Sequence, residues 1–342
     1  MSAVPLDAEA WRYSARAWQA LHVQEFVAAS PVAELPPSLA AAFDWPQTRT
    51  NRIVFVNGEA QADAEIRLRD GERLHLVFVN MPAARATRWQ REFTIALDAG
   101  SAEIVEQHIG EAGADVLGEL GTQLRLGAGA QLRVISMSDL PDSVSLRRSE
   151  RIDVAAGGAY TSHQVVCGGR LQRFDLDVTM AGARASYLAR GVFMPRARQH
   201  IDVHLDAKHV AGDTRSDVAW RGVADGRGRG ILHGAITVAQ GADGADARLE
   251  TKNLLLSPHA EIDAQPVLEI YADEVKAAHG ATVGQLDERA LFYLRSRGIP
   301  VATARALMIG GFCREAFDGI ANGDLRARMD ALLDAQLAQV AP

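Results

Sequence analysis

The spacing of apolar residues changes twice along the 342-residue chain, and each change predicts a different secondary structure. Near the start, Trp11, Trp18 and Phe26 recur at roughly helical spacing, which predicts a helix with a packed tryptophan face. From Arg52 the apolar residues alternate with polar ones, as they do in strands, and helical spacing returns only at Ala281. The pattern therefore predicts a strand-rich centre between two helical ends.

Turns in the strand-rich region recur at a nearly constant interval. Residues Arg52–Val56 are predicted to form a strand, which ends at the tight-turn dipeptide Asn57-Gly58. Later turns are spaced 28, 29 and 26 residues apart, counted between the alanines that follow them: Ala102, Ala130, Ala159 and Ala185. Strand–turn units of fixed period are typical of a solenoid, because each coil buries its inner face only against its neighbours. We therefore predict a β-helix; the alternative, a β-sandwich, needs no such period.

Three helices are predicted after the strands. Asp287 caps the first helix, which ends before Pro300. The second runs from Val301 to about Ile320, with these residues facing inward: Ala304, Leu307, Met308, Gly311 and Phe312. The third starts at Asp324 and gathers one apolar face: Leu325, Met329, Leu332, Leu333, Leu337 and Val340. We expect these helices to form a cap over the open end of the β-helix, whose last coil would otherwise expose backbone groups.

Composition narrows the classes of protein that fit this pattern. The chain is 48% hydrophobic and 23% charged, an ordinary balance for a globular protein, and its net charge of −7 disfavours nucleic acid as a partner. No run of about 18 apolar residues predicts a membrane span, and residues 1–7 do not resemble a signal peptide. Cys167 and Cys313 match no metal-binding spacing and are predicted to be small buried residues. We therefore expect a reduced, cytoplasmic protein without a Cys₄ cluster of its own.

One histidine lies in a distinctive passage. The run Pro266–Val275 has the apolar character of a strand, and Ala278-His279-Gly280-Ala-Thr-Val-Gly284 follows it. The passage resembles the SufB/SufD family of iron–sulfur cluster assembly scaffolds. Its His-Gly-Ala-Thr-Val-Gly motif is similar to the motif of the SufD branch. Residues 54–58 (Val-Phe-Val-Asn-Gly) resemble another element of the family. The resemblance implies a mainly β fold with a right-handed parallel β-helix core at residues 51–275, a short helical segment at 1–50 and a helical domain at 276–342.

The family resemblance assigns a candidate role to His279. It implies that this histidine, placed between the last strand and the helical cap, meets a SufB cysteine where the cluster forms. Neutral imidazole can ligate iron beside a thiolate, so His279 is a candidate metal ligand. Many relatives have a cysteine two residues earlier, where this chain has Ala277, so any thiolate must come from the partner. From the residues alone, a structural histidine remains the alternative.

The same resemblance implies a non-catalytic scaffold that pairs with a SufB-like protein and binds a SufC-like ATPase. No cofactor is then held stably by this chain, and a transient iron–sulfur cluster forms at the SufB interface. We expect the ATPase to contact the first C-terminal helix, at Leu291, Phe292, Tyr293 and Arg297. We expect sheet extension toward SufB through the strands near Ile231, Ile236 and Val238 and through the segment up to Val275. Whether the isolated chain forms a homodimer stays open.

A second group of polar residues allows two structural interpretations. Strand alternation would place His200, Asp202, His204 and Asp206 on one face, with apolar residues on the other. Such a face could hold a divalent metal, but a solvated strand face is the favoured interpretation. The alternative function is a β-helix enzyme that acts on polysaccharide. No Ser-His-Asp, paired-carboxylate or HExxH motif stands out, which favours a protein that is not an enzyme.

Overall fold

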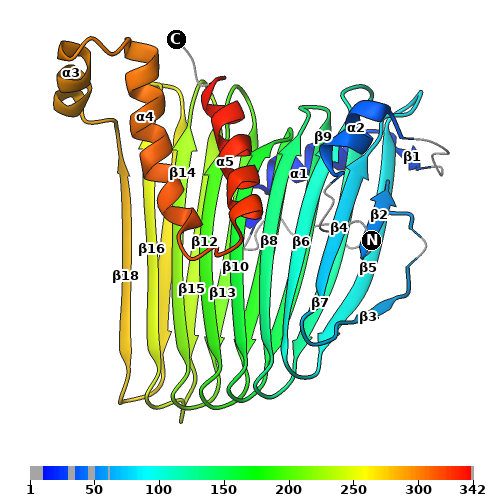
Figure 1. The fold of residues 1–342 in the computed structure, drawn as a ribbon, viewed down its shortest axis with the longest axis vertical. Helices are drawn as coiled ribbons and strands as arrows, with labels where there is room; N and C mark the ends of the chain where they lie inside the picture. Colours follow the sequence, from blue (N-terminus) through cyan, green and yellow to red (C-terminus); the bar gives the residue numbers. More distant parts are fainter. Residues whose placement is uncertain (1–10, 30–34, 45–50, 61, 340–342) are drawn as a thin grey trace.

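The computed structural model describes residues 11–29, 35–44, 51–60 and 62–339, and its centre is a parallel β-helix built from two sheets (Figure 1). The first nine-stranded sheet contains β1 (Val27–Ala28), β3 (Glu65–Arg67), β5 (Thr87–Leu97), β7 (Val116–Leu126), β9 (Val144–Val154), β11 (Leu171–Met180), β13 (His200–His209), β15 (Arg229–Val238) and β17 (Glu261–Ile270). The second contains β2 (Arg52–Val56), β4 (Arg73–Asn80), β6 (Ser101–Gly110), β8 (Gln131–Leu140), β10 (Ala159–Gly168), β12 (Ser186–Met194), β14 (Arg215–Ala224), β16 (Asp246–Leu255) and β18 (Lys276–Gly284). The predicted parallel β-helix is confirmed.

The strand register explains the repeat seen in the sequence. Ala159 in β10 pairs in parallel with Gln131 in β8 on one side and with Ser186 in β12 on the other. Strands of the two sheets alternate along the chain, so each coil contributes one strand to each sheet. One repeat of the sequence is therefore one coil of the β-helix, as predicted.

The two ends of the β-helix are built differently. At the N-terminal end, stacked rings of Phe55, Phe78 and Phe93 fill the interior, with centroids 4.7 Å apart for the first pair. Leu68 is buried against the same core, so the chain that follows β2 closes this end. At the other end β17 and β18 form the last coil, and nearly every residue of β18 is exposed. The interior of the β-helix is therefore closed at one end and open at the other.

The N-terminal helix α1 (Ala15–Val23) lies on the outer face of the first sheet. Trp11, Trp18 and Leu21 form a buried cluster with Leu117 of β7 and Leu171 of β11. This confirms that the tryptophans form a packing face. The predicted helix extends further than the observed one, because Gln24 at the C-cap is already extended.

The C-terminal helices cover a side of the β-helix and leave its open end free, which corrects the prediction that they cap that end. These helices are α3 (Glu288–Ser296), α4 (Val301–Arg314) and α5 (Gly323–Leu337), with a 3₁₀ turn, η3 (Glu315–Phe317), between the last two. Figure 1 shows α4 and α5 over the second sheet, while α3 stands beyond them at one corner. The physical reason is that strands of this sheet carry apolar residues on their outer face as well: Val105, Ile135, Met137, Val165, Val192 and Val223.

The buried faces of these helices were only partly predicted. Ala304 is buried as expected, but Leu307 is 54% exposed, and Ile309 and Cys313 face the sheet instead. On α5 the predicted apolar face is largely confirmed, with Leu325, Met329, Leu333 and Leu337 buried. Val340 lies outside the described residues.

The last strand also shifts the expected boundary between the β-helix and the helices. That boundary was placed at residue 275, but β18 continues the coil through residues 276–284 and pairs in parallel with β16. Helical structure begins at Glu288, with Asp287 as its N-cap, as predicted. Small residues obscured β18 in the sequence, since its alternation carries few large apolar side chains. No helix among the described residues is long and apolar enough to cross a membrane.

An ionic cluster lies inside the β-helix, next to its apolar core. Arg148 Nη2 of β9 is 2.7 Å from Glu106 Oε1 of β6 and also contacts the Glu150 carboxylate. His108 Nε2 is 2.5 Å from the same oxygen of Glu106, and Tyr160 of β10 is buried beside the group. Burial disfavours ionisation of Glu106, but the Arg148 charge together with the His108 and Ser136 contacts outweighs it and lowers the pKa of Glu106 to about 2. Burial raises the pKa of Glu150, because the attraction of its carboxylate to Arg148 does not compensate for the loss of solvation.

These opposite shifts predict different effects for two conservative substitutions. We expect Glu106→Gln to lower the free energy of unfolding at pH 7 by roughly 3 kcal/mol, and Glu150→Gln by less than about 1 kcal/mol. The contribution of Glu106 is present above pH 4.5 and is lost as the pH falls toward 2. The pH dependence of Glu150 is the reverse: its stabilising contribution is present below pH 4.5 and is lost as the pH rises through its raised pKa. Urea unfolding of both variants from pH 3 to 9 measures this, and equal losses at pH 7 would contradict the assignment.

Candidate functional site

The open end of the β-helix is the candidate functional site. β17 is hydrogen-bonded only to β15 in its sheet, and β18 only to β16, so each has a free edge within the described chain. Unpaired strand edges present aligned N–H and C=O groups, which pair readily with another strand. Ile270, Tyr271 and Val283 of the last coil are 41%, 62% and 46% exposed. The last coil therefore combines free backbone edges with exposed apolar side chains.

His279 lies in the middle of this last coil, which corrects its expected position between the strand and a helical cap. It is exposed and stands in register with Leu249 of β16, a member of the interior core. Ala277, two residues earlier on the same face, packs partly against that core. By strand alternation, His279 therefore belongs to the column of residues that lines the inside of the coil. An end-on partner would cover it together with the interior.

Among the residues that the structure describes, His279 belongs to no set of metal ligands. No group of three or more His, Cys, Asp or Glu residues in the described part of the chain could hold a metal ion. A ligand role for His279 would therefore need further ligands from a second molecule. Ala277 supplies none, since it has no donor atom.

The helix α3 presents a second exposed surface near the same end. Asp287 caps the helix by accepting a hydrogen bond from Arg289 N at 2.8 Å, and Gly298 ends it in a left-handed conformation with φ +84°. Phe292 and Tyr293 are 71% and 57% exposed.

Of the four residues predicted to bind the ATPase, three are accessible. Arg297 stacks on the Tyr293 ring, with its guanidinium 5.2 Å from the ring centroid. Its Nη2 also donates to the Tyr293 hydroxyl at 3.3 Å. Leu291, in contrast, is buried and helps to hold the helix in place. Tyr293 and Arg297, with Phe292 beside them, therefore form an exposed aromatic and cationic surface on α3.

The residues predicted to extend the sheet toward a partner do not lie at an edge. β15 is hydrogen-bonded along its length to β13 on one side and β17 on the other. Ile231, Ile236 and Val238 are fully buried, and the last two belong to the interior core. The expectation is therefore corrected for β15; the free edges are those of β17, which lies in the expected segment up to Val275, and of β18. A sequence cannot distinguish these strands, because edge position depends on which coil is last.

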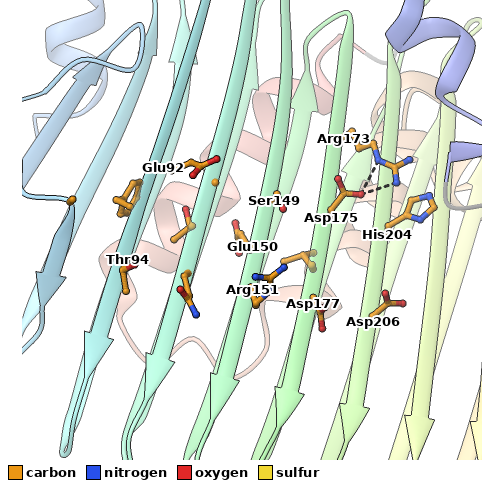
Figure 2. A pocket seen from close by; sticks show the side chains of 16 residues that line it. Glu92, Thr94, Ser149, Glu150, Arg151, Arg173, Asp175, Asp177, His204 and Asp206 are labelled. Atoms are coloured by element: carbon orange, nitrogen blue, oxygen red, sulfur yellow. Dashed lines mark hydrogen bonds and ion pairs between the residues drawn. The ribbon is translucent and has the colours of Figure 1, made fainter. Parts of the chain in front are cut away.

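The polar residues of β13 face a shallow groove of about 610 Å³ on the outer face of the first sheet (Figure 2). Asp175 is held by two cations: Arg173 Nη2 lies 2.7 Å from Oδ1, and Arg147 Nε donates to Oδ2 at 3.0 Å. Asp177 binds Lys208 Nζ at 2.7 Å. Because cations hold both carboxylates, neither is placed as a general acid or base of a polysaccharide-cleaving pair.

Above this groove, part of the face predicted to be solvated is buried. Asp202 is fully buried, accepts a hydrogen bond from Ser14 and binds Arg173 Nη1 at 2.8 Å. His204 Nε2 lies 3.1 Å from the other Asp202 oxygen. The N-terminal segment covers this face, so the expectation of a fully solvated face is wrong.

The grouping of Ser14, His200 and Asp202 is not that of a nucleophilic triad. His200 Nε2 is 3.0 Å from Ser14 Oγ, and burial lowers the pKa of His200 to about 4. The carboxylate, however, binds the serine directly, and Ser14 is fully buried. Ser14 and Arg173 were missed in the sequence, since only the strand register and the docked N-terminal segment bring them to Asp202.

Both cysteines are buried between the second sheet and the helices, as predicted. Cys167 of β10 and Cys313 of α4 belong to one apolar cluster and are fully buried. Burial raises the pKa of Cys313 to about 12 and also raises that of Cys167 well above its usual range, so both stay protonated thiols. Neither thiol is therefore available as a cluster ligand in this fold.

Comparison with known proteins identifies relatives of this architecture. Residues 79–312 match the family described as "SUF system FeS cluster assembly, SufBD core domain". The chain is 33% identical over 176 residues to the iron–sulfur cluster assembly protein SufD of Escherichia coli (strain K12), covering 52% of this chain and 42% of that protein. It is 31% identical over 216 residues to an iron–sulfur cluster assembly SufBD family protein of Mycobacterium tuberculosis, covering 61% of this chain and 54% of that protein.

A third relative is a SufBD family protein of Synechocystis, 32% identical over 215 residues, covering 61% of this chain and 46% of that protein. The chain spans about half the length of the curated relatives it matches. The family match runs from β4 into α4, so it includes the last coil and α3.

Proposed function

This chain belongs to the SUF-system iron–sulfur cluster assembly family defined by the SufBD core domain, and on that basis we propose that it acts as a non-catalytic scaffold subunit of such a system. The observation that supports this most directly is the asymmetry of the β-helix, which is closed by phenylalanines at one end and open at the other. Ile270, Tyr271 and Val283 and the two free strand edges lie together at the open end, as a pairing surface requires.

We propose that the open end pairs with a SufB-like protein. A partner strand added to β17 or β18 would satisfy the free backbone groups, and a partner coil would bury Ile270, Tyr271 and Val283. A second copy of this chain carries the same surface, so a homodimer is the expected state when the SufB-like partner is absent.

In this arrangement His279 faces the seam between the two β-helices. Its imidazole would donate one nitrogen ligand to a transient iron–sulfur cluster, and the SufB-like partner would supply the thiolates. The chain by itself would then hold no cofactor stably, because His279 alone supplies one nitrogen ligand.

We further propose that a SufC-like ATPase binds the exposed surface of α3. Phe292, Tyr293 and Arg297 are residue types that anchor protein interfaces, and they project from a short helix at the corner of the molecule (Figure 1). ATP hydrolysis would occur on that partner, since this chain carries no P-loop motif.

The pairing surface can be tested by truncating two of its exposed apolar side chains. The variant Ile270→Ala/Val283→Ala should bind the SufB-like protein about 30-fold more weakly, because each truncation removes roughly 1 kcal/mol of apolar burial. Both residues are exposed in the free chain, so the stability of the fold should change little. Titration calorimetry with the purified partner measures the affinity.

A matched control uses an exposed valine away from the open end. Val210, in the turn after β13, is 49% exposed, and Val210→Ala should leave the affinity unchanged. Equal affinities for the double variant and the control would show that the open end is not the pairing surface.

A further inference from the structure

One buried arginine joins the C-terminal helices to the sheet beside the last coil. Arg221 of β14 is 6% exposed, and its Nη2 lies 2.8 Å from Glu315 Oε2 of η3 and 2.8 Å from Glu250 Oε1 of β16. Its Nε also donates to Glu315 at 3.2 Å, and its Nη1 donates to the Trp220 carbonyl at 3.2 Å. A single guanidinium therefore holds two carboxylates that belong to different layers of the molecule.

On the helical side, Arg221 holds the lower end of α4. Glu315 directly follows the last residue of α4, and the Phe312 ring lies 5.8 Å from the Arg221 guanidinium. The other end of α4 carries α3, whose main packing partner is α4 (Figure 1). A displacement of α3 is therefore transmitted along α4, a rigid helix, to the Glu315 contact.

On the sheet side, one strand, β16, lies between β14, which carries Arg221, and the terminal strand β18. Glu250 stands in register with Gly280 of β18, and the preceding pair is Leu249 with His279. β16 is the only strand to which β18 is hydrogen-bonded among the described residues. A shift of β16 at Glu250 therefore affects the backbone hydrogen bonds between β16 and β18, which hold β18 in the sheet.

We propose that Arg221 couples the position of α4 to the terminal strand β18, so that movement of the C-terminal helices changes the exposure of the edge that carries His279. Two arrangements are available to Arg221. In the structure it is shared between Glu315 and Glu250, and when η3 moves away it remains with Glu250 alone. The side chains of Glu250 and Glu315 are 46% and 57% exposed, so each can be released into water at modest cost.

A partner-free experiment tests the coupling in the full-length chain. Hydrogen–deuterium exchange of peptides that cover residues 276–284 should be about fivefold faster in Arg221→Met than in the unmodified chain, while β8 and β10 are unchanged. Glu315→Gln alone should accelerate the same peptides. In the Arg221→Met background, Glu315→Gln should add nothing, because the two residues then no longer share a contact.

A matched control removes another arginine from the same helical layer. Arg326 donates to the Phe317 carbonyl at 2.8 Å and to Asp330 at 3.2 Å, so its hydrogen bonds stay within that layer. Arg326→Met should leave exchange in β18 unchanged. Unchanged exchange of β18 in both Arg221→Met and Glu315→Gln would overturn the coupling. Uniform acceleration of all strands in Arg221→Met would also overturn it, because Arg221 would then be a general structural clamp.

A second arm adds the SufC-like ATPase and rests on the function proposed above. Binding of the ATPase should alter exchange of residues 276–284 in the unmodified chain and leave it unaltered in Arg221→Met, with similar affinity for both. A bound ATPase that alters β18 equally in both chains would overturn the coupling. An ATPase that fails to bind either chain contradicts the proposed function, whereas the partner-free result still decides the coupling.

Discussion

A chain that carries Phe292→Ser and Tyr293→Ser is expected to lose at least about 100-fold in affinity for a SufC-like ATPase while its fold is retained. Exposed aromatic side chains at the centre of an interface typically contribute about 2 kcal/mol or more each, so two together exceed this loss. Both residues are more than half exposed, so their replacement removes little packing within this chain. Surface plasmon resonance with immobilised ATPase measures the affinity.

The neighbouring residue Leu291 distinguishes a lost contact from a lost helix. Because Leu291 is buried, Leu291→Ala should loosen α3 and lower both helix content and ATPase affinity. The double serine variant should lower the affinity alone, with an unchanged circular dichroism spectrum. Full ATPase binding by the double serine variant would exclude this surface as the docking site.

Replacing His279 with alanine is expected to reduce the yield of iron–sulfur cluster on the reconstituted complex about 10- to 100-fold, with the complex still assembled. Loss of one residue that supports a metal site typically lowers metal affinity or activity by this factor. The imidazole is exposed in the last coil, and no group of three or more His, Cys, Asp or Glu residues that could hold a metal ion lies in the described part of the chain. Cluster yield follows from iron and sulfide content and from visible absorption after anaerobic reconstitution.

Two further variants separate ligation from structure. His279→Cys keeps a donor atom for iron at the same position, so it should retain more cluster than the alanine variant. His259, exposed in the turn before β17, is the matched control, and His259→Ala should leave the yield unchanged. A normal cluster yield from the His279→Ala complex would make His279 a structural residue.

Fold and site differed in how far they could be predicted. The fold could be read from the repeat, because parallel stacking places residues of successive coils opposite one another, as Ala159 lies opposite Gln131 and Ser186. The place where the C-terminal helices pack could not be predicted from the sequence. Their place on the second sheet depends on outward apolar residues such as Val165 and Val192, which a strand pattern does not separate from inward ones.

His279 shows the same division within the candidate site. Its neighbours in sequence drew attention to it, and the resemblance suggested a role, but its orientation depends on pairing with Leu249, thirty residues away in register. The prediction for β15 failed for a related reason. Ile236 lies in a strand with suitable side chains, yet both edges of that strand are already occupied.

By itself, the sequence determined the strand-rich centre and the coil length, because alternation and turn spacing are local properties of the chain. The family was indicated by the resemblance of the passage around His279. Only the tertiary structure decided which coil is last, which edge is free and which charges meet. Arg173 and Asp202, or Arg221 and Glu315, become partners only after strands and helices from different coils are packed together. Such contacts depend on register and layer order, which act over distances that no local pattern encodes.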